Sequence, residues 1–124
     1  MCRTDVAVPW GRLAYVRDSP LAAYRGWQRM LNAIEPGSPL PIHRHRHTSE
    51  TVVVLRGRLV WEYYDEVELR CTERIEVCPN GPVVALNIPA GRWHTVRALE
   101  SGSVLLEMKE GAYEALVEED ILAL

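Results

Sequence analysis

Hydrophobic residues in this chain come in short runs rich in Val, Leu, Ile, Tyr and Trp, and Gly or Pro interrupts these runs frequently. Short apolar runs separated by turn-forming residues are typical of an all-β sandwich or barrel. We therefore expect an all-β protein with strands over Trp27–Glu35, Thr51–Arg56, Arg58–Tyr64, Leu69–Ile75, Val83–Ile88, His94–Ala98 and Val104–Lys109.

The two ends of the chain are less regular than its middle. Ser19-Pro20 can cap a short N-terminal helix over Leu21–Trp27, because Pro is favoured at the first helical position, and an extended arm is the alternative. The acidic tail 112–124 is either a helix or a segment draped over the surface. At 124 residues we expect one domain over 1–124, with its core at about 27–110.

Composition and charge exclude several classes of protein. The chain is 48% hydrophobic and 25% charged, as globular proteins are, and its net charge of −3 argues against a nucleic-acid partner. Apolar runs such as Val52–Leu55 are too short to span a membrane, and no signal peptide follows Met1, so we expect a cytoplasmic protein. Cys2, Cys71 and Cys78 are odd in number and widely spaced, which predicts free thiols.

All four histidines occur in two places, His43, His45 and His47 in one tract and His94 alone. Imidazole and carboxylate groups bind first-row divalent metals, and Glu50 follows the tract. Residues two apart share a strand face, so all three tract histidines can point the same way. This spacing alone does not decide which two of them bind a metal.

The odd spacing from His45 to Glu50 requires a break in the strand between them, for which Thr48-Ser49 is a candidate turn. Glu50 would then open the next strand and face inward. Arg44, Arg46, Arg56 and Arg58 surround the tract, and we interpret them as a solvated face in preference to an anion site.

These spacings resemble the two sequence motifs of the cupins. The first motif is Gly, five residues, His-x-His, three or four residues, Glu, six residues, Gly, and this chain matches it with Gly37, His43, His45, Glu50 and Gly57. The second contains Pro-x-Gly-x-x-His, which is present here as Pro89-Ala90-Gly91-Arg92-Trp93-His94. The leading Gly and closing Asn of that motif are replaced by Val83 and Ala98.

A narrower resemblance, over about residues 19 to 113, is to the WbuC-type cupin-fold metalloproteins, small bacterial proteins of unsettled chemistry. Family members often have Lys-Trp where this chain has Thr48-Ser49, so a substrate contact from those two positions is not implied here. The resemblance is carried by the His tract and by Gln28–Ala33, Pro36–Ser38, Val53–Gly57, Ile88–His94 and Glu107–Gly111.

The cupin resemblance implies an antiparallel jelly-roll barrel whose interior holds His43, His45, Glu50 and His94. These four would bind one divalent metal per chain, which is Fe, Mn, Zn or Ni, and would leave coordination positions open for a ligand. The resemblance also implies a homodimer, and the apolar residues on both faces of Val52–Leu55 agree with it.

Catalytic candidates are Glu107, Lys109 and Arg29, none of which the sequence assigns with certainty to the barrel interior. If the apolar residues of the last strand pack in the core, Glu107 and Lys109 face outward; if its polar face is internal, Glu107 reaches a metal-bound water. Gln28 and Arg29 either orient a substrate anion or lie on a solvated face. His47 is expected at the solvent or the rim.

Trp61 and Tyr63 share a strand face and either line the pocket or belong to the core. Trp93 is expected to point away from the metal.

Three functions fit this pattern. The first is a metal-dependent enzyme that acts on a small polar molecule, either sugar-like or carboxylate-bearing, with isomerase- or dioxygenase-like chemistry. The second is a non-catalytic module that uses the metal to bind or sense a small molecule, and the third is a purely structural barrel. Arg29 or Lys109 beside a metal would favour an anionic ligand.

Overall fold

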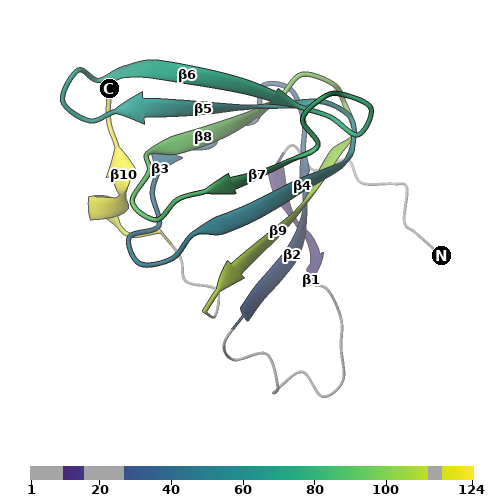
Figure 1. Ribbon diagram of the computed structural model, residues 1–124, viewed down its shortest axis with the longest axis horizontal. Coiled ribbons are helices and arrows are strands. Elements are labelled where there is room, and N and C mark those ends of the chain that lie inside the picture. The colour runs from purple at the N-terminus through teal and green to yellow at the C-terminus, as the bar shows by residue number, and fades with distance from the viewer. Residues whose placement is uncertain (1–9, 16–26, 112–115) are drawn as a thin grey trace.

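The computed structural model describes residues 10–15, 27–111 and 116–124 as two antiparallel five-stranded sheets that form a jelly-roll barrel (Figure 1). The first sheet has the order β1-β2-β9-β4-β7. Its strands are β1 (Trp10–Tyr15), β2 (Trp27–Ile34), β9 (Ser103–Glu110), β4 (Glu50–Arg56) and β7 (Ala85–Ile88).

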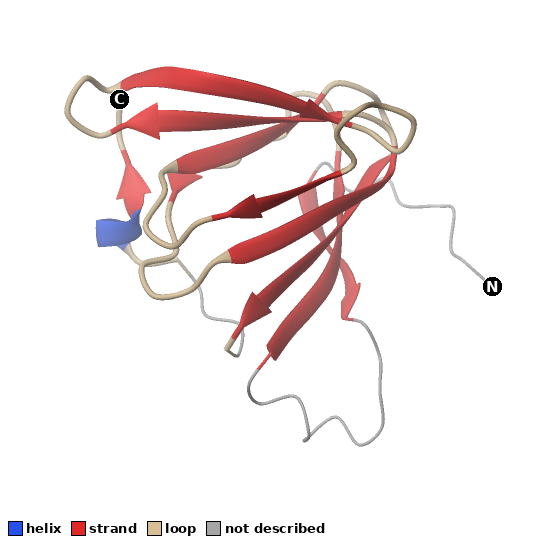
Figure 2. Ribbon diagram, viewed as in Figure 1, coloured by secondary structure: helices blue, strands red, loops and turns tan. Residues whose placement is uncertain are grey.

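The second sheet has the order β10-β3-β8-β5-β6 and faces the first. Figure 2 shows that the described part of the chain is almost entirely strand and loop, apart from the short 3-10 helix η2 (Glu118–Asp120). The strands of this sheet are β10 (Ile121–Leu122), β3 (Ile42–His43), β8 (His94–Ala98), β5 (Leu59–Asp65) and β6 (Arg70–Val77).

Alternation of side chains along each strand fills the space between the sheets. On β4, Val52 and Val54 are buried while Val53 between them is partly exposed. On β2 the even-numbered side chains face inward, and on β9 the odd-numbered ones do. The buried apolar core consists of Ile34, Val52, Val54, Leu59, Trp61, Tyr63, Val77, Ile88, Val96, Ala98 and Leu105.

The strands predicted from the sequence are all present, with ends that differ by one or two residues. The apolar pattern did not predict β1 or the pairing of the tail. Within the described part of the tail, the helix alternative is reduced to the single turn of η2, and Ile121 pairs with His43 and Leu122 with Ile42. The helix expected over Leu21–Trp27 lies outside the described residues except for Trp27, which is the first residue of β2.

Gly57 forms the tight connection between β4 and β5. Its φ of +80° lies in the left-handed region that favours glycine. A Cβ at this position would lie 2.2 Å from Ser103 Oγ and 2.8 Å from Ser103 Cα, so the backbones also approach too closely for a side chain. The last glycine of the first motif is therefore required by the turn and by its neighbour.

Two further expectations concern the chain as a whole. Across the described residues, none of the helical structure has the length and apolar character needed to cross a membrane. Cys71 and Cys78 are free thiols, as predicted, and Cys2 lies outside the described residues.

Candidate metal centre

The two sequence motifs meet on neighbouring strands of the second sheet. His43 on β3 and His94 on β8 are register partners, so their imidazole groups stand side by side, with ring centroids 4.4 Å apart. His45 lies just beyond the end of β3. Its carbonyl accepts a hydrogen bond of 2.7 Å from the backbone N–H of Gly91, which ties the first motif to the glycine of the second.

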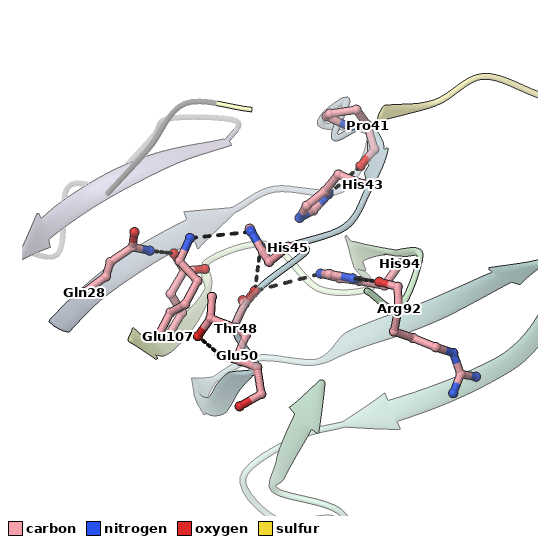
Figure 3. Close-up of polar contacts among 11 residues, drawn as sticks. Gln28, Pro41, His43, His45, Thr48, Glu50, Arg92, His94 and Glu107 are labelled. Atoms are coloured by element: carbon pink, nitrogen blue, oxygen red, sulfur yellow. Dashed lines mark hydrogen bonds and ion pairs between the residues drawn. The ribbon is translucent and has the colours of Figure 1, made fainter. Parts of the chain in front are cut away.

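Glu50 reaches the same place from the opposite sheet. The chain bends at Arg46 and His47, close to the turn predicted at Thr48-Ser49, and β4 then begins at Glu50. Glu50 Oε2 lies 2.9 Å from His45 Nε2 and 3.9 Å from His94 Nε2. Figure 3 shows these side chains pointing toward a common centre between the sheets.

The three histidines have the geometry of a metal site. One ring nitrogen from each of His43, His45 and His94 lies within 4.8 Å of the others. His43 Nδ1–H donates to the Pro41 carbonyl at 2.9 Å, and His94 Nδ1–H donates to the Arg92 carbonyl at 2.8 Å (Figure 3). Because these bonds place the proton on Nδ1, each Nε2 keeps its lone pair for a metal.

The environment also keeps the histidines in the form that binds metals. Burial lowers the pKa of His43 and of His45 to about 4, and that of His94 to about 3. All three are therefore neutral at pH 7. Metal ligation requires neutral imidazole, so the site does not have to lose protons from these groups before an ion binds.

Glu50 provides a test of whether a metal fits. Its side chain is buried, burial raises its pKa, and Oε2 has no hydrogen-bond partner. An orphaned carboxylate oxygen beside the Nε2 atoms of His45 and His94 is costly by itself, and a divalent ion would satisfy it and favour its ionised form. The residues present thus fit a divalent metal held by His43, His45, Glu50 and His94.

The remaining histidine and its neighbouring arginines lie away from this centre. His47 is exposed and is not part of the histidine group. Arg44 Nε and Arg46 Nε donate to Asp120 Oδ1 at 3.2 and 2.6 Å, and the Arg44 N–H donates to the Asp120 carbonyl at 3.1 Å. These two arginines therefore form a specific contact with the C-terminal segment, which the interpretation as a solvated face did not anticipate.

Glu107, Lys109 and Gln28 form a second group beside the candidate ligands. Their strands β9 and β2 are paired, and Gln28 Nε2 donates to Glu107 Oε1 at 2.5 Å (Figure 3). Burial, with the charge of Glu50 and a hydrogen bond to it, raises the pKa of Glu107 to about 8. Lys109 is buried, and its Nζ lies 3.5 Å from His45 Nδ1. The polar face of β9 is thus the internal one.

A cavity of about 380 Å³ extends from this polar group into the barrel. Glu107, Lys109 and Gln28 line it, whereas Arg29 does not and lies on the opposite face of β2. Trp61 both lines the cavity and belongs to the core, the two positions that the sequence left open for it. Tyr63 belongs to the core.

Trp93 is turned toward Glu66, to which its Nε1–H donates at 2.9 Å, and toward the guanidinium of Arg44.

The motifs did not predict several residues of the cavity wall. Leu116 and Ile121 belong to the C-terminal segment, which has no pattern that assigns it to a barrel. Asn32 and Met30 share the inward face of β2 with Gln28. Their spacing of two and four residues from Gln28 is the sequence signal that predicts this shared face.

Comparison with known proteins agrees with the fold described above. A family model described as a domain of unknown function, DUF6016, matches residues 22–76, which is less than half of the chain. No curated protein matches the sequence significantly.

Similar solved structures include KdgF from Halomonas sp., with a TM-score of 0.63, 18% identity, and coverage of 88% of this chain and 86% of that one. The Cnp3 cupin domain of Schizosaccharomyces pombe has a TM-score of 0.55 and 12% identity over 84% of this chain and 64% of that chain. A variant of oxalate decarboxylase from Bacillus subtilis has a TM-score of 0.60 and 20% identity over 89% of this chain and only 27% of that one. Identities this low show the fold alone, and the fold of this chain is that of the cupins.

Proposed function

We propose that this protein is a small metal-dependent cupin, of the WbuC-type that its sequence resembles, which binds and chemically transforms a small anionic molecule. The observation that carries the proposal is the buried Glu50 Oε2, which lies against two histidine nitrogens but has no hydrogen-bond partner, at the polar end of a cavity. In this proposal His43, His45, Glu50 and His94 hold one divalent ion. The donor set suits Fe, Mn, Zn and Ni alike.

The metal would supply Lewis-acid polarisation of a ligand oxygen, or a site for dioxygen if it is iron. The protein's own groups would orient the ligand. Lys109 is a buried cation that makes no ion pair with a carboxylate of the described residues, so an anionic group of the ligand can take this role. Glu107 is placed to hold or donate a proton beside that group.

The charges in the cavity favour an anion over a neutral ligand. A divalent ion and the Lys109 ammonium together carry one more positive charge than Glu50 and Glu107 can cancel, even when both are ionised. A buried excess of positive charge is relieved when an anion enters.

The neighbours named oxalate decarboxylase and putative sugar phosphate isomerase from Acidithiobacillus ferrooxidans support the proposal, because each of these names denotes a substrate with an anionic group.

The test is metal analysis followed by a screen for turnover. Protein loaded separately with iron, manganese, zinc or nickel is incubated with a library of small sugars and acids, while product formation and oxygen uptake are measured. Turnover that chelation removes and metal restores is the expected result. Binding without turnover under every metal would instead assign the alternative function, a non-catalytic binding or sensing module. Absence of stoichiometric metal after loading would contradict both.

A further inference from the structure

The walls of the cavity narrow the class of ligand that the proposed function leaves open. We propose that the ligand is a carboxylate with a compact apolar body, and that it is not a polyhydroxylated sugar acid. This inference rests on the proposed function, since it takes the metal and Lys109 as the site of the anionic group. It adds that the apolar walls of the cavity determine which kind of body the ligand has.

Few polar groups line the cavity outside the candidate metal ligands: three of them lie together, and the Asn32 amide on the inward face of β2 is the fourth. Glu107, Lys109 and Gln28 lie together on the paired strands β2 and β9, next to the candidate metal ligands. Gln28 is 3% exposed and its Oε1 has no hydrogen-bond partner, so it offers a buried acceptor to a ligand, and the Asn32 amide, 7% exposed, is a further polar group of the wall. These groups can pair with a carboxylate and with one or two hydroxyl or N–H groups, but they are too few for the full set of hydroxyl groups on a sugar acid.

Most of the remaining wall is apolar. Met30, Ile34, Trp61, Val96 and Leu105 line the interior from four different strands, and all five are buried. A hydroxyl group pressed against these side chains would give up its hydrogen bonds to water without replacement. An apolar body buries its surface there favourably.

The rim continues the apolar wall, because Leu40, Leu116 and Ile121 also line the cavity. Leu116 and Ile121 are 36% and 39% exposed, so they stand at its mouth and not in its floor. The volume of about 380 Å³ is near the lower end of the roughly 300–1,000 Å³ range of ligand cavities. A single ring or a short alkyl chain fits this space.

The experiment is calorimetric titration of zinc-loaded and metal-free protein with four probes. Phenylacetate and hexanoate represent apolar carboxylates, and gluconate and galacturonate represent polyhydroxylated ones. We expect phenylacetate or hexanoate to bind zinc-loaded protein at least about tenfold more tightly than either sugar acid.

Two pairs of variants locate the binding. Lys109→Met should weaken phenylacetate binding about tenfold, while Arg56→Met, at the exposed end of β4, should not. Ile121→Asn should weaken phenylacetate more than gluconate, while Leu124→Asn, which is exposed and outside the cavity, should change neither.

A spectroscopic readout separates direct contact from a structural effect. Lys109 is the only lysine in the sequence, so protein labelled with ¹³Cε-lysine gives one side-chain NMR signal. That signal should shift when phenylacetate is added to zinc-loaded protein and should not shift with 2-phenylethanol, which lacks the carboxylate.

The outcomes separate a failure of the ligand inference from a failure of the proposed function. If gluconate or galacturonate binds as tightly as the apolar acids, or if Ile121→Asn leaves phenylacetate binding unchanged, the inference about the ligand body is overturned and the metal-dependent anion site stands. If no carboxylate prefers zinc-loaded over metal-free protein, the proposed function itself fails.

Discussion

At the scale of single residues, the structure separates the histidines by role. His94 is 2% exposed and faces the candidate centre, while His47 is exposed. We predict that His94→Ala or His45→Ala loses most of its metal, because each removes one of only four proposed ligands. His47→Ala is the matched control and should keep nearly all of it. Elemental analysis after dialysis measures this, and retention of stoichiometric metal by a His45→Ala, His94→Ala double variant would show that the ligands are others.

The buried histidines also predict how the metal-free protein responds to acid. Their pKa values fall from 6.5 to about 4 for His43 and His45 and to about 3 for His94, so between these limits the unfolded chain binds more protons than the folded one. The free energy of unfolding should therefore decrease as the pH falls from 6.5 to about 4. Urea denaturation of chelator-treated protein at a series of pH values tests this.

Glu107 should have the opposite effect. Its pKa is raised from 4.5 to about 8, so its contribution to stability is complete at pH 4.5 and is lost as the pH rises through about 8. The variant Glu107→Gln removes this contribution and should make the acid-induced loss of stability steeper. Glu50, whose pKa burial also raises, opposes the histidines as well, but three histidines outweigh one carboxyl group. Stability of metal-free Glu107→Gln that is constant from pH 7 to pH 4 would contradict the assignment of buried, neutral histidines.

Gly57 and Gly37 form a natural comparison within the first motif. Both have a positive φ, +80° and +85°, but only Gly57 lies against a neighbour, Ser103, while nothing lies within 4 Å of a Cβ on Gly37. Gly57→Ala should therefore cost about 3 kcal/mol or more of unfolding free energy, from backbone strain together with overlap. Gly37→Ala should cost only about 1 kcal/mol, from strain alone. Equal losses in thermal or urea denaturation would mean that the contact with Ser103 is unimportant.

At the scale of elements, strand β3 is short and depends on its neighbours. It has two residues, one register pair with β8, and two with β10 from the C-terminal segment. Asp120 reinforces this edge by accepting from both Arg44 and Arg46. The alternation of His and Arg in the tract thus has a physical reason: one face carries the candidate ligands, and the other attaches their strand to the tail.

This attachment predicts an effect of Asp120 on the metal. Asp120→Ala should weaken zinc binding about tenfold, because removing partners that orient metal ligands typically costs 10- to 100-fold in affinity. Glu118→Gln, in the same 3-10 turn, is the control. Competition with a chromophoric chelator measures affinity, and the visible spectrum of the cobalt-loaded protein reports ligand geometry. An unchanged affinity and spectrum would show that β3 keeps its ligands in place without the tail.

The sequence predicted the elements that depend on local patterns and missed those that depend on distant pairing. The strands from β4 to β9 follow from apolar runs between Gly and Pro, and the spacing of the motifs predicted a break before Glu50. By contrast, β10 forms because Ile121 pairs with His43, nearly eighty residues earlier, and no local pattern records such a partner. For the same reason the sequence alone does not decide which side of β9 faces inward, because that side depends on how β9 pairs with β2.

At the scale of the whole molecule, the first sheet carries a cluster of apolar residues on its outer face as well as in the core. Its inner face fills the barrel, and on its outer face Leu106 is in register with Val53 on one side and Leu31 on the other. Around them lie further partly exposed apolar residues, namely Leu55, Val104 and Met108. A sheet that faced water on its outer side would carry polar residues at these positions.

We predict that this outer face is covered by a second copy of the chain in a homodimer. Contiguous apolar surface of this kind marks an interaction site, and a face that is self-complementary across a twofold axis is the simplest way to bury it. Light scattering at tens of micromolar should give the mass of a dimer. Leu106→Glu should give a folded monomer, because it places a charge at the centre of the buried face. Val67→Glu, at an isolated position that is 86% exposed in the turn between β5 and β6, should leave the dimer intact. A monomer for the unmodified chain would mean that a different partner covers this sheet.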